Sequence, residues 1–259
     1  VVTVDKTGGG TVVSTIYMSK AMQDMMAQMA GAMGGKQEAP AKNPLLGDLE
    51  QYKSKTASMG EGVTFVSAKE VKKADGSTGA EITYSFKDIN KLKVSSNPDT
   101  PSGGGMGPGG GEAKKNESPV TFTFVKGATP KLTIQLPKQD APAAAKPAEK
   151  APAEEAPPPE QLAQMKQMFD GFRVRLVVKV DGDITKSNAS FVDKDAKTGK
   201  KQAVTLIDMD LGKMMKDDAT FKKMTAMGKI EDMATAREKM KDIPGFKFET
   251  AEKIDIEFK

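Results

Sequence analysis

The chain has 259 residues, enough for one or two domains, and its 39 basic and 35 acidic residues give a net charge of +4. The two signs of charge are interspersed and aromatic residues make up only 5%, so we expect no nucleic-acid partner. The sequence contains no His and no Cys, which excludes serine–histidine and cysteine catalysis and most zinc, copper and haem sites.

The first 92 residues predict a β-hairpin, a helix and further strands. Val1–Val4 and Thr11–Tyr17 are rich in β-branched residues, and the permissive turn Gly8–Gly10 lies between them. This pattern is typical of a hairpin. The elements expected after it are a Met-rich helix from Ser19, a second helix over 45–56, and strands over 62–66 and 81–86. We interpret residues 1–92 as an N-terminal α+β half.

The helix that begins at Ser19 carries the most unusual pattern in the chain, because its sulfur side chains recur every three or four residues and so share one face. These residues are Met22, Met25, Met26, Met29 and Met33. One interpretation is that they cover the sheet. The other is that they line an adaptable apolar groove, since Met suits surfaces that accept varied partners. We take them as the candidate ligand-binding residues.

Two segments of biased composition separate the predicted elements. Residues 93–119 are rich in Gly, Pro, Ser and Asn and predict a disordered loop. Residues 120–136 contain two alternating runs around Gly127 and predict a β-hairpin. Residues 137–159 consist mainly of Ala, Pro, Glu and Lys and predict an extended, solvent-exposed loop.

Residues 160–259 are interpreted as a C-terminal α+β half. Its clearest strand covers 172–180, with apolar residues on one face and Arg173 and Arg175 on the other. Asp181-Gly182 then predicts a turn that folds the chain back into an antiparallel sheet. The other elements expected here are a strand over 203–209, helices over 160–169, 211–215, 221–227 and 230–240, and strands over 246–248 and 254–258.

Together these elements predict an α+β fold in which an antiparallel β-sheet is covered on one face by Met-rich amphipathic helices. The strings Val2–Asp5 and Val178–Asp181 resemble each other, and the residues after Gly62 resemble those after Gly245. A duplication into two halves, each a hairpin, helices and a strand, is one interpretation. Chance similarity in a chain rich in Val, Lys and Ala is the other.

No motif in the sequence indicates chemistry. The acid pairs Asp181/Asp183, Asp193/Asp195 and Asp208/Asp210 do not match a calcium-loop spacing, so we interpret them as turn acids and solvated edges. Lys186 and Ser187 are adjacent and would point to opposite faces of a strand. We therefore expect no catalytic residues, no metal and no cofactor. A hydrolase that uses carboxylates and Lys is the enzymatic alternative.

The order of turns and alternating strands in the first 92 residues resembles the LppM-like domain of secreted bacterial lipoproteins. The resemblance rests on Val2–Asp5, Gly8–Gly10, Val12–Tyr17, the strand after Gly62, and Gly79–Asp88, which reads as Gly, strand, Phe-x-Asp. It implies a non-enzymatic protein of the bacterial cell envelope that binds a lipid or another envelope protein. It also implies membrane attachment through a lipidated N-terminal Cys, which this sequence does not contain.

Two functions are therefore expected from the sequence. The first is an extracytoplasmic binding protein for an apolar or lipid-like ligand or an envelope partner, with the Met residues as its site. The second is an interaction module in which the loop over 137–159 meets a partner.

Overall fold

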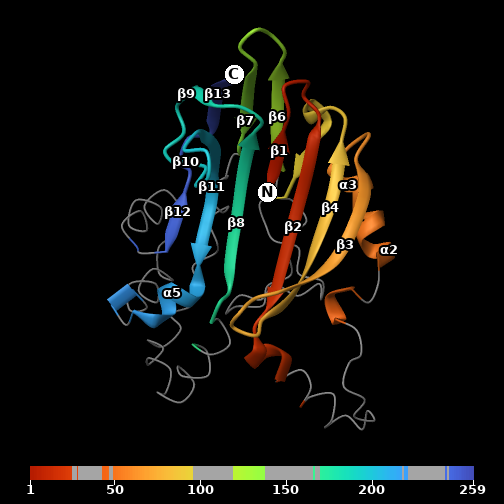
Figure 1. The fold of residues 1–259 in the computed structure, drawn as a ribbon, viewed down its shortest axis with the longest axis vertical. Helices are drawn as coiled ribbons and strands as arrows, with labels where there is room; N and C mark the ends of the chain where they lie inside the picture. Colours follow the sequence, from red (N-terminus) through yellow and green to blue (C-terminus); the bar gives the residue numbers. More distant parts are fainter. Residues whose placement is uncertain are drawn as a thin grey trace, which may run out of the picture.

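The computed structural model describes residues 1–24, 28, 43–46, 49–95, 119–137, 166, 170–217, 219–220, 243 and 245–259. Within these ranges strands predominate and form two sheets (Figure 1). No helix among the described residues has the length and apolar character needed to cross a membrane.

The large sheet has eight strands in the order β10-β11-β8-β1-β2-β4-β3, with β12 also paired to β11. Neighbouring strands are antiparallel except for β1 and β8, which are parallel. Its strands are β1 (Val2–Val4), β2 (Gly10–Met18), β3 (Thr64–Lys72), β4 (Thr78–Phe86), β8 (Arg173–Val180), β10 (Val192–Lys194), β11 (Lys201–Asp210) and β12 (Phe246–Phe248).

The small sheet has five antiparallel strands in the order β5-β6-β7-β13-β9. They are β5 (Lys93–Val94), β6 (Val120–Val125), β7 (Lys131–Gln135), β13 (Lys253–Phe258) and β9 (Ile184–Ser187). The helical elements are short: η1 (Pro44–Leu46), α2 (Leu49–Ser54), α3 (Thr56–Met59), η2 (Ile89–Lys91) and α5 (Leu211–Lys216).

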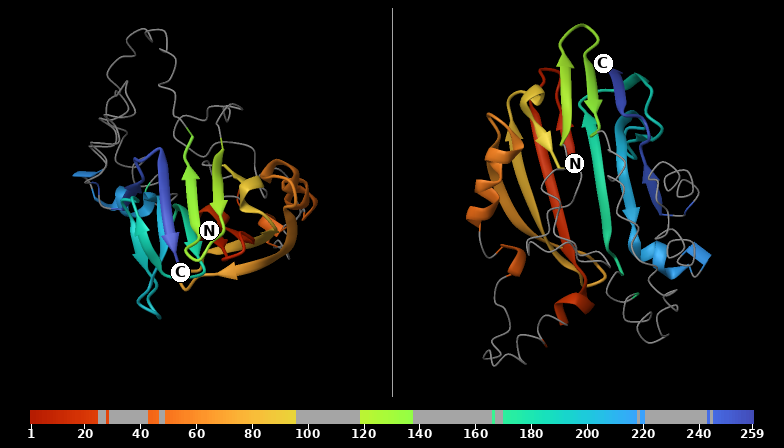
Figure 2. Two further views of the ribbon diagram at one scale, coloured as in Figure 1. Left: turned by 90° about the horizontal axis from the view of Figure 1, so that it is seen from above. Right: turned by 180° about the vertical axis from the view of Figure 1, so that it is seen from behind.

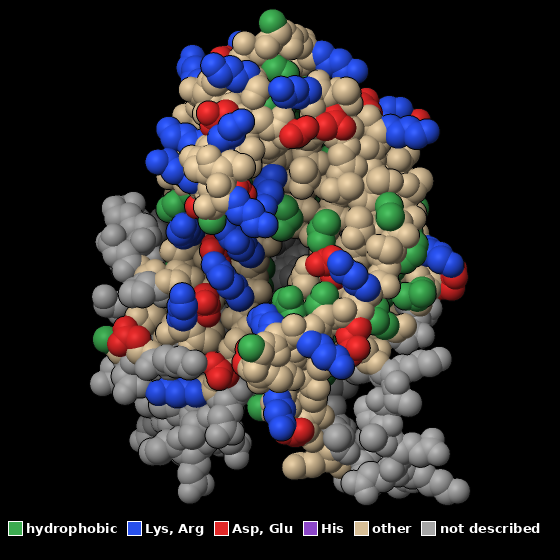
Figure 3. Space-filling view, viewed as in Figure 1, with side chains coloured by type: hydrophobic (Ala, Val, Ile, Leu, Met, Phe, Trp, Pro, Cys, Tyr) green, Lys and Arg blue, Asp and Glu red, His purple; other side chains and the backbone are tan. Residues whose placement is uncertain are grey.

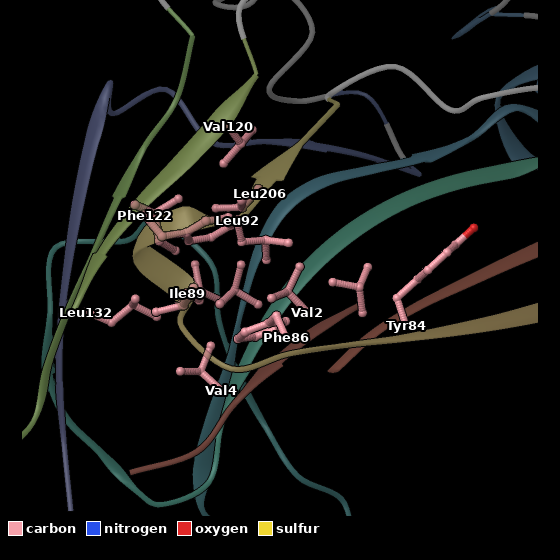
Figure 4. Close-up of a cluster of buried hydrophobic side chains, with 14 of the residues drawn as sticks. Val2, Val4, Tyr84, Phe86, Ile89, Leu92, Val120, Phe122, Leu132 and Leu206 are labelled. Atoms are coloured by element: carbon pink, nitrogen blue, oxygen red, sulfur yellow. The ribbon is translucent and has the colours of Figure 1, made fainter. Parts of the chain in front are cut away.

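The core lies between the two sheets, which face each other as layers when the molecule is seen from above (Figure 2). Val2 and Phe86 of the large sheet point toward Phe122 and Leu132 of the small sheet (Figure 4). All four side chains are at most 5% exposed. Alternation along each strand places one apolar face inward, and burying these two faces against each other supplies the main stabilisation.

The predicted α+β fold with a sheet covered by Met-rich helices is wrong, because a second sheet covers the large one. The reason is that β6, β7 and β13 each have an apolar face. Joined in one sheet, they bury a larger apolar area against the large sheet than short helices can. The helices η1 and α2 lie against β3 and β4, where Tyr52 donates its hydroxyl to the carbonyl of Leu45 (2.6 Å).

The expected reversal at Asp181-Gly182 is also wrong, because the chain crosses there from the large sheet to the small one. Strand β9 pairs with β13, and the backbone N–H of Asp183 donates to the carbonyl of Lys259 (2.9 Å). A Cβ on Gly182 would lie 2.5 Å from that carbonyl oxygen, so this close crossing requires glycine. The predicted hairpins β1–β2 and β6–β7 are confirmed.

The two Val-x-Val-Asp strings lie side by side in the large sheet. Val2 pairs with Val178 and Val4 with Val180 in the parallel β1–β8 ladder. The N-terminal and C-terminal parts of the chain therefore build one sheet and meet at this ladder. Duplication of the two halves stays a prediction.

Candidate functional site

The predicted Met groove falls largely on residues that the structure does not describe. Met22 is half-buried and packs against the core, and its backbone N–H donates to the Ser19 side chain (3.3 Å), as expected for a helix cap. Met25, Met26, Met29 and Met33 lie outside the described residues. All of the loop over 137–159 except Pro137 also lies outside them. Both sites stay predictions.

A small cavity of about 90 Å³ lies beside Leu176 of β8 and Ile207 of β11 in the large sheet and Val120 of β6 in the small sheet. It is lined by Val120, Leu136, Pro137, Leu176, Ile207, Phe248, Glu249, Thr250, Ala251 and Glu252. Typical ligand pockets measure roughly 300–1,000 Å³. This cavity therefore fits one small apolar group and is not a lipid-sized pocket.

A wider hollow of about 420 Å³ lies over the outer face of the small sheet, and most of the residues that line it have polar or charged side chains. Its side chains already pair with one another: Lys131 contacts Glu257 (3.0 Å) and Thr133 donates to Asp255 (2.6 Å). These polar groups are directed at each other, so the hollow offers little to a ligand.

The most distinctive feature of the large sheet is that the given sequence begins inside it. The short strand β1 lies between β2 and β8, and Val1 adds one further rung: its amine donates to the Val13 carbonyl (2.6 Å) and its carbonyl accepts from the Val13 N–H (2.8 Å). Beyond Val1, β2 and β8 both continue, and no strand of the described chain lies between them. Figure 3 shows a hollow on this face, between the two strands.

The free length of the interruption follows from the register. Continuing the β1–β8 and β1–β2 ladders past Val1 places Leu176 opposite Ser14, and Arg173 opposite Tyr17. A Cβ on Gly171 would lie 3.9 Å from a carboxylate oxygen of Asp75, so the β3–β4 turn approaches the lower end. We call this interruption the slot; it is lined by Ser14–Tyr17 of β2 and Arg173–Leu176 of β8, four residues on each side.

Backbone hydrogen-bonding groups of both walls point into the slot. The N–H and C=O of Val13 face β1, so by the alternation of an antiparallel strand those of Thr15 and Tyr17 face the slot. On the other wall, the backbone N–H of Asp181 donates to the carbonyl of Val4 in β1 (2.8 Å). By the same alternation, the backbone N–H and C=O groups of Arg175 and Arg173 face the slot. The slot thus has the two-sided pairing geometry of a missing strand.

The two rims of the slot differ in chemistry. On the inner side, toward the small sheet, Ile16, Val174 and Leu176 are half-buried and apolar. On the outer side stand Arg173 and Arg175, each with a side chain 45% exposed. A strand in the slot would therefore have an apolar inner face and a cationic outer neighbour.

The outer cations belong to an ion-pair network across β8, β10, β11 and β12. Arg173 binds both oxygens of Asp208 (2.5 and 2.6 Å), and these hydrogen bonds raise the pKa of its guanidinium. Arg175 lies 3.5 Å from Asp208 and 3.6 Å from Asp193, and Lys247 lies 3.8 Å from Asp193. Asp210, which pairs with Arg173 in the β8–β11 ladder, adds a third carboxylate beside these three cations. Figure 3 shows Lys and Arg gathered over this half of the sheet.

Most acids singled out in the sequence have local structural roles. Asp183 accepts from the Lys201 N–H (3.0 Å), and Asp210 caps α5 by accepting from the Lys213 N–H (3.0 Å). Backbone hydrogen bonds from the turn at Thr198 lower the pKa of Asp195. Asp208 is different, because it is 6% exposed and paired with Arg173 across two strands, which sequence reasoning missed. Among the described residues, no three potential metal ligands come together.

The Val1 amine at the upper end of the slot predicts a dependence of stability on pH. In the 259-residue chain, burial lowers its pKa from 8.0 to about 6, and the Arg175 and Lys179 cations add to this. The unfolded chain then binds more protons between pH 6 and 8, so the free energy of unfolding rises with pH. Because Val1 is 37% exposed, solvent screening reduces the expected rise to about 1 kcal/mol.

Urea unfolding at pH 6 and pH 8 measures this rise. The window is informative because the chain has no His, the side chain that ordinarily titrates there. Acetylation of the Val1 amine is the control and should flatten the dependence. Equal stability of the unmodified chain at the two pH values would contradict the prediction.

The fold and the slot define a two-sheet β protein with an interrupted sheet. No family model, no curated protein and no solved structure matches the chain. The resemblance to the LppM-like domain, and the cell-envelope location that it implies, stay predictions.

Proposed function

We propose that the protein is a non-enzymatic binding protein that accepts a short extended polypeptide segment in the slot between β2 and β8. The observation that supports this is that β2 and β8 both continue beyond the β1 ladder, with backbone groups directed at the interval between them. A separate polypeptide and residues that precede Val1 in a longer polypeptide would pair with these groups in the same way, and the test separates the two. An added strand gains main-chain hydrogen bonds and places alternate side chains in different surroundings, which is the basis of recognition by strand addition.

Pairing on two sides favours the slot over the outer edges of the sheets. A segment beside β3 or β9 would pair with one strand, whereas a segment in the slot pairs with two. Each net hydrogen bond contributes about 0.5–1.5 kcal/mol, so a second ladder adds substantially to affinity even for four residues. An envelope protein is the partner that the resemblance to LppM-like domains implies.

The test uses the peptide acetyl-Thr-Val-Thr-Val-amide and amide hydrogen exchange of the whole protein. With saturating peptide, we expect slower exchange at Thr15 and Tyr17 of β2 and at Arg175 of β8, because their N–H groups gain acceptors. Protection at an outer edge such as β3 in their place, or no protection at all, would contradict the proposal.

A pair of variants at Thr15 separates the backbone from the side chain. Thr15→Pro removes an N–H that faces the slot and not β4, so the sheet should fold while the peptide binds at least about tenfold more weakly. Thr15→Val keeps the N–H and should bind as the unmodified protein does. Circular dichroism shows whether each variant folds. If the Pro variant does not fold, the hydrogen-exchange measurement on the unmodified protein tests whether the peptide binds in the slot.

A further inference from the structure

We draw no further inference here: the strongest candidate, the cavity of about 90 Å³ beside Leu176, Ile207 and Phe248 of the large sheet and Val120 of the small sheet, carries no proposal because nothing in the part of the chain that the structure describes shows what covers it.

Discussion

Replacement of Phe258 by Ala is expected to lower the free energy of unfolding by about 3–5 kcal/mol, the usual cost of emptying a buried aromatic site. Phe258 is fully buried, and its ring centre lies 6.3 Å from that of Phe124. It ends β13, which pairs with both β7 and β9 and so joins the two parts of the small sheet. The cavity would therefore open between the sheets, where backbone relaxation is restricted.

Urea unfolding followed by circular dichroism measures this loss. Val125→Ala is the control in the same sheet, because Val125 is 58% exposed and its truncation should cost less than about 0.5 kcal/mol. A loss of less than about 1 kcal/mol for Phe258→Ala would show that the contact between the sheets is not the main core.

Replacement of Glu249 by Ala is expected to lower the free energy of unfolding by about 3 kcal/mol, because four donors in part-buried hydrogen bonds would lose their common acceptor. Glu249 is 1% exposed, and its carboxylate accepts from the N–H groups of Ser190 (2.7 Å), Thr250 (3.0 Å) and Ala251 (3.1 Å). It also accepts from the Ser190 hydroxyl (2.9 Å). These bonds join the β9–β10 connection to the β12–β13 connection.

Glu249→Gln should lower the free energy of unfolding by less than Glu249→Ala does. The amide of Gln keeps one oxygen as an acceptor, while its NH₂ group faces a donor. Glu252→Ala, at an exposed position three residues away, is the control and should cost less than about 0.5 kcal/mol. Thermal unfolding of the three variants ranks them. Equal stability of Glu249→Ala and Glu252→Ala would show that the connections are held by other contacts.

Phe258 and Glu249 stabilise different parts of the structure around the slot. Phe258 holds the small sheet against the inner face of the large one. Glu249 holds β12 beside β11, where its own N–H donates to Leu206 (2.8 Å). Because β8 pairs with β11, loosening either position should also weaken peptide binding, and stability must be measured beside affinity in every variant.

The sequence by itself determined the local elements. Alternation along 172–180 predicted a strand whose outer face carries Arg173 and Arg175, and the structure places both on that face. The segment Gly8–Gly10 predicted a turn, and Gly8 has a positive φ of 90°. Ser19 predicted a helix cap and accepts from Met22. These features depend on neighbouring residues, so a single sequence contains the information for them.

Only the tertiary structure decided which strands meet and what covers them. The alternation of residues indicates that one side of β2 or β8 is apolar. It does not indicate whether helices or a second sheet bury that side. The parallel β1–β8 ladder joins residues about 176 positions apart, and the Arg173–Asp208 pair joins two strands. Which strands become neighbours depends on burial summed over the whole chain, and a single sequence window does not contain that information.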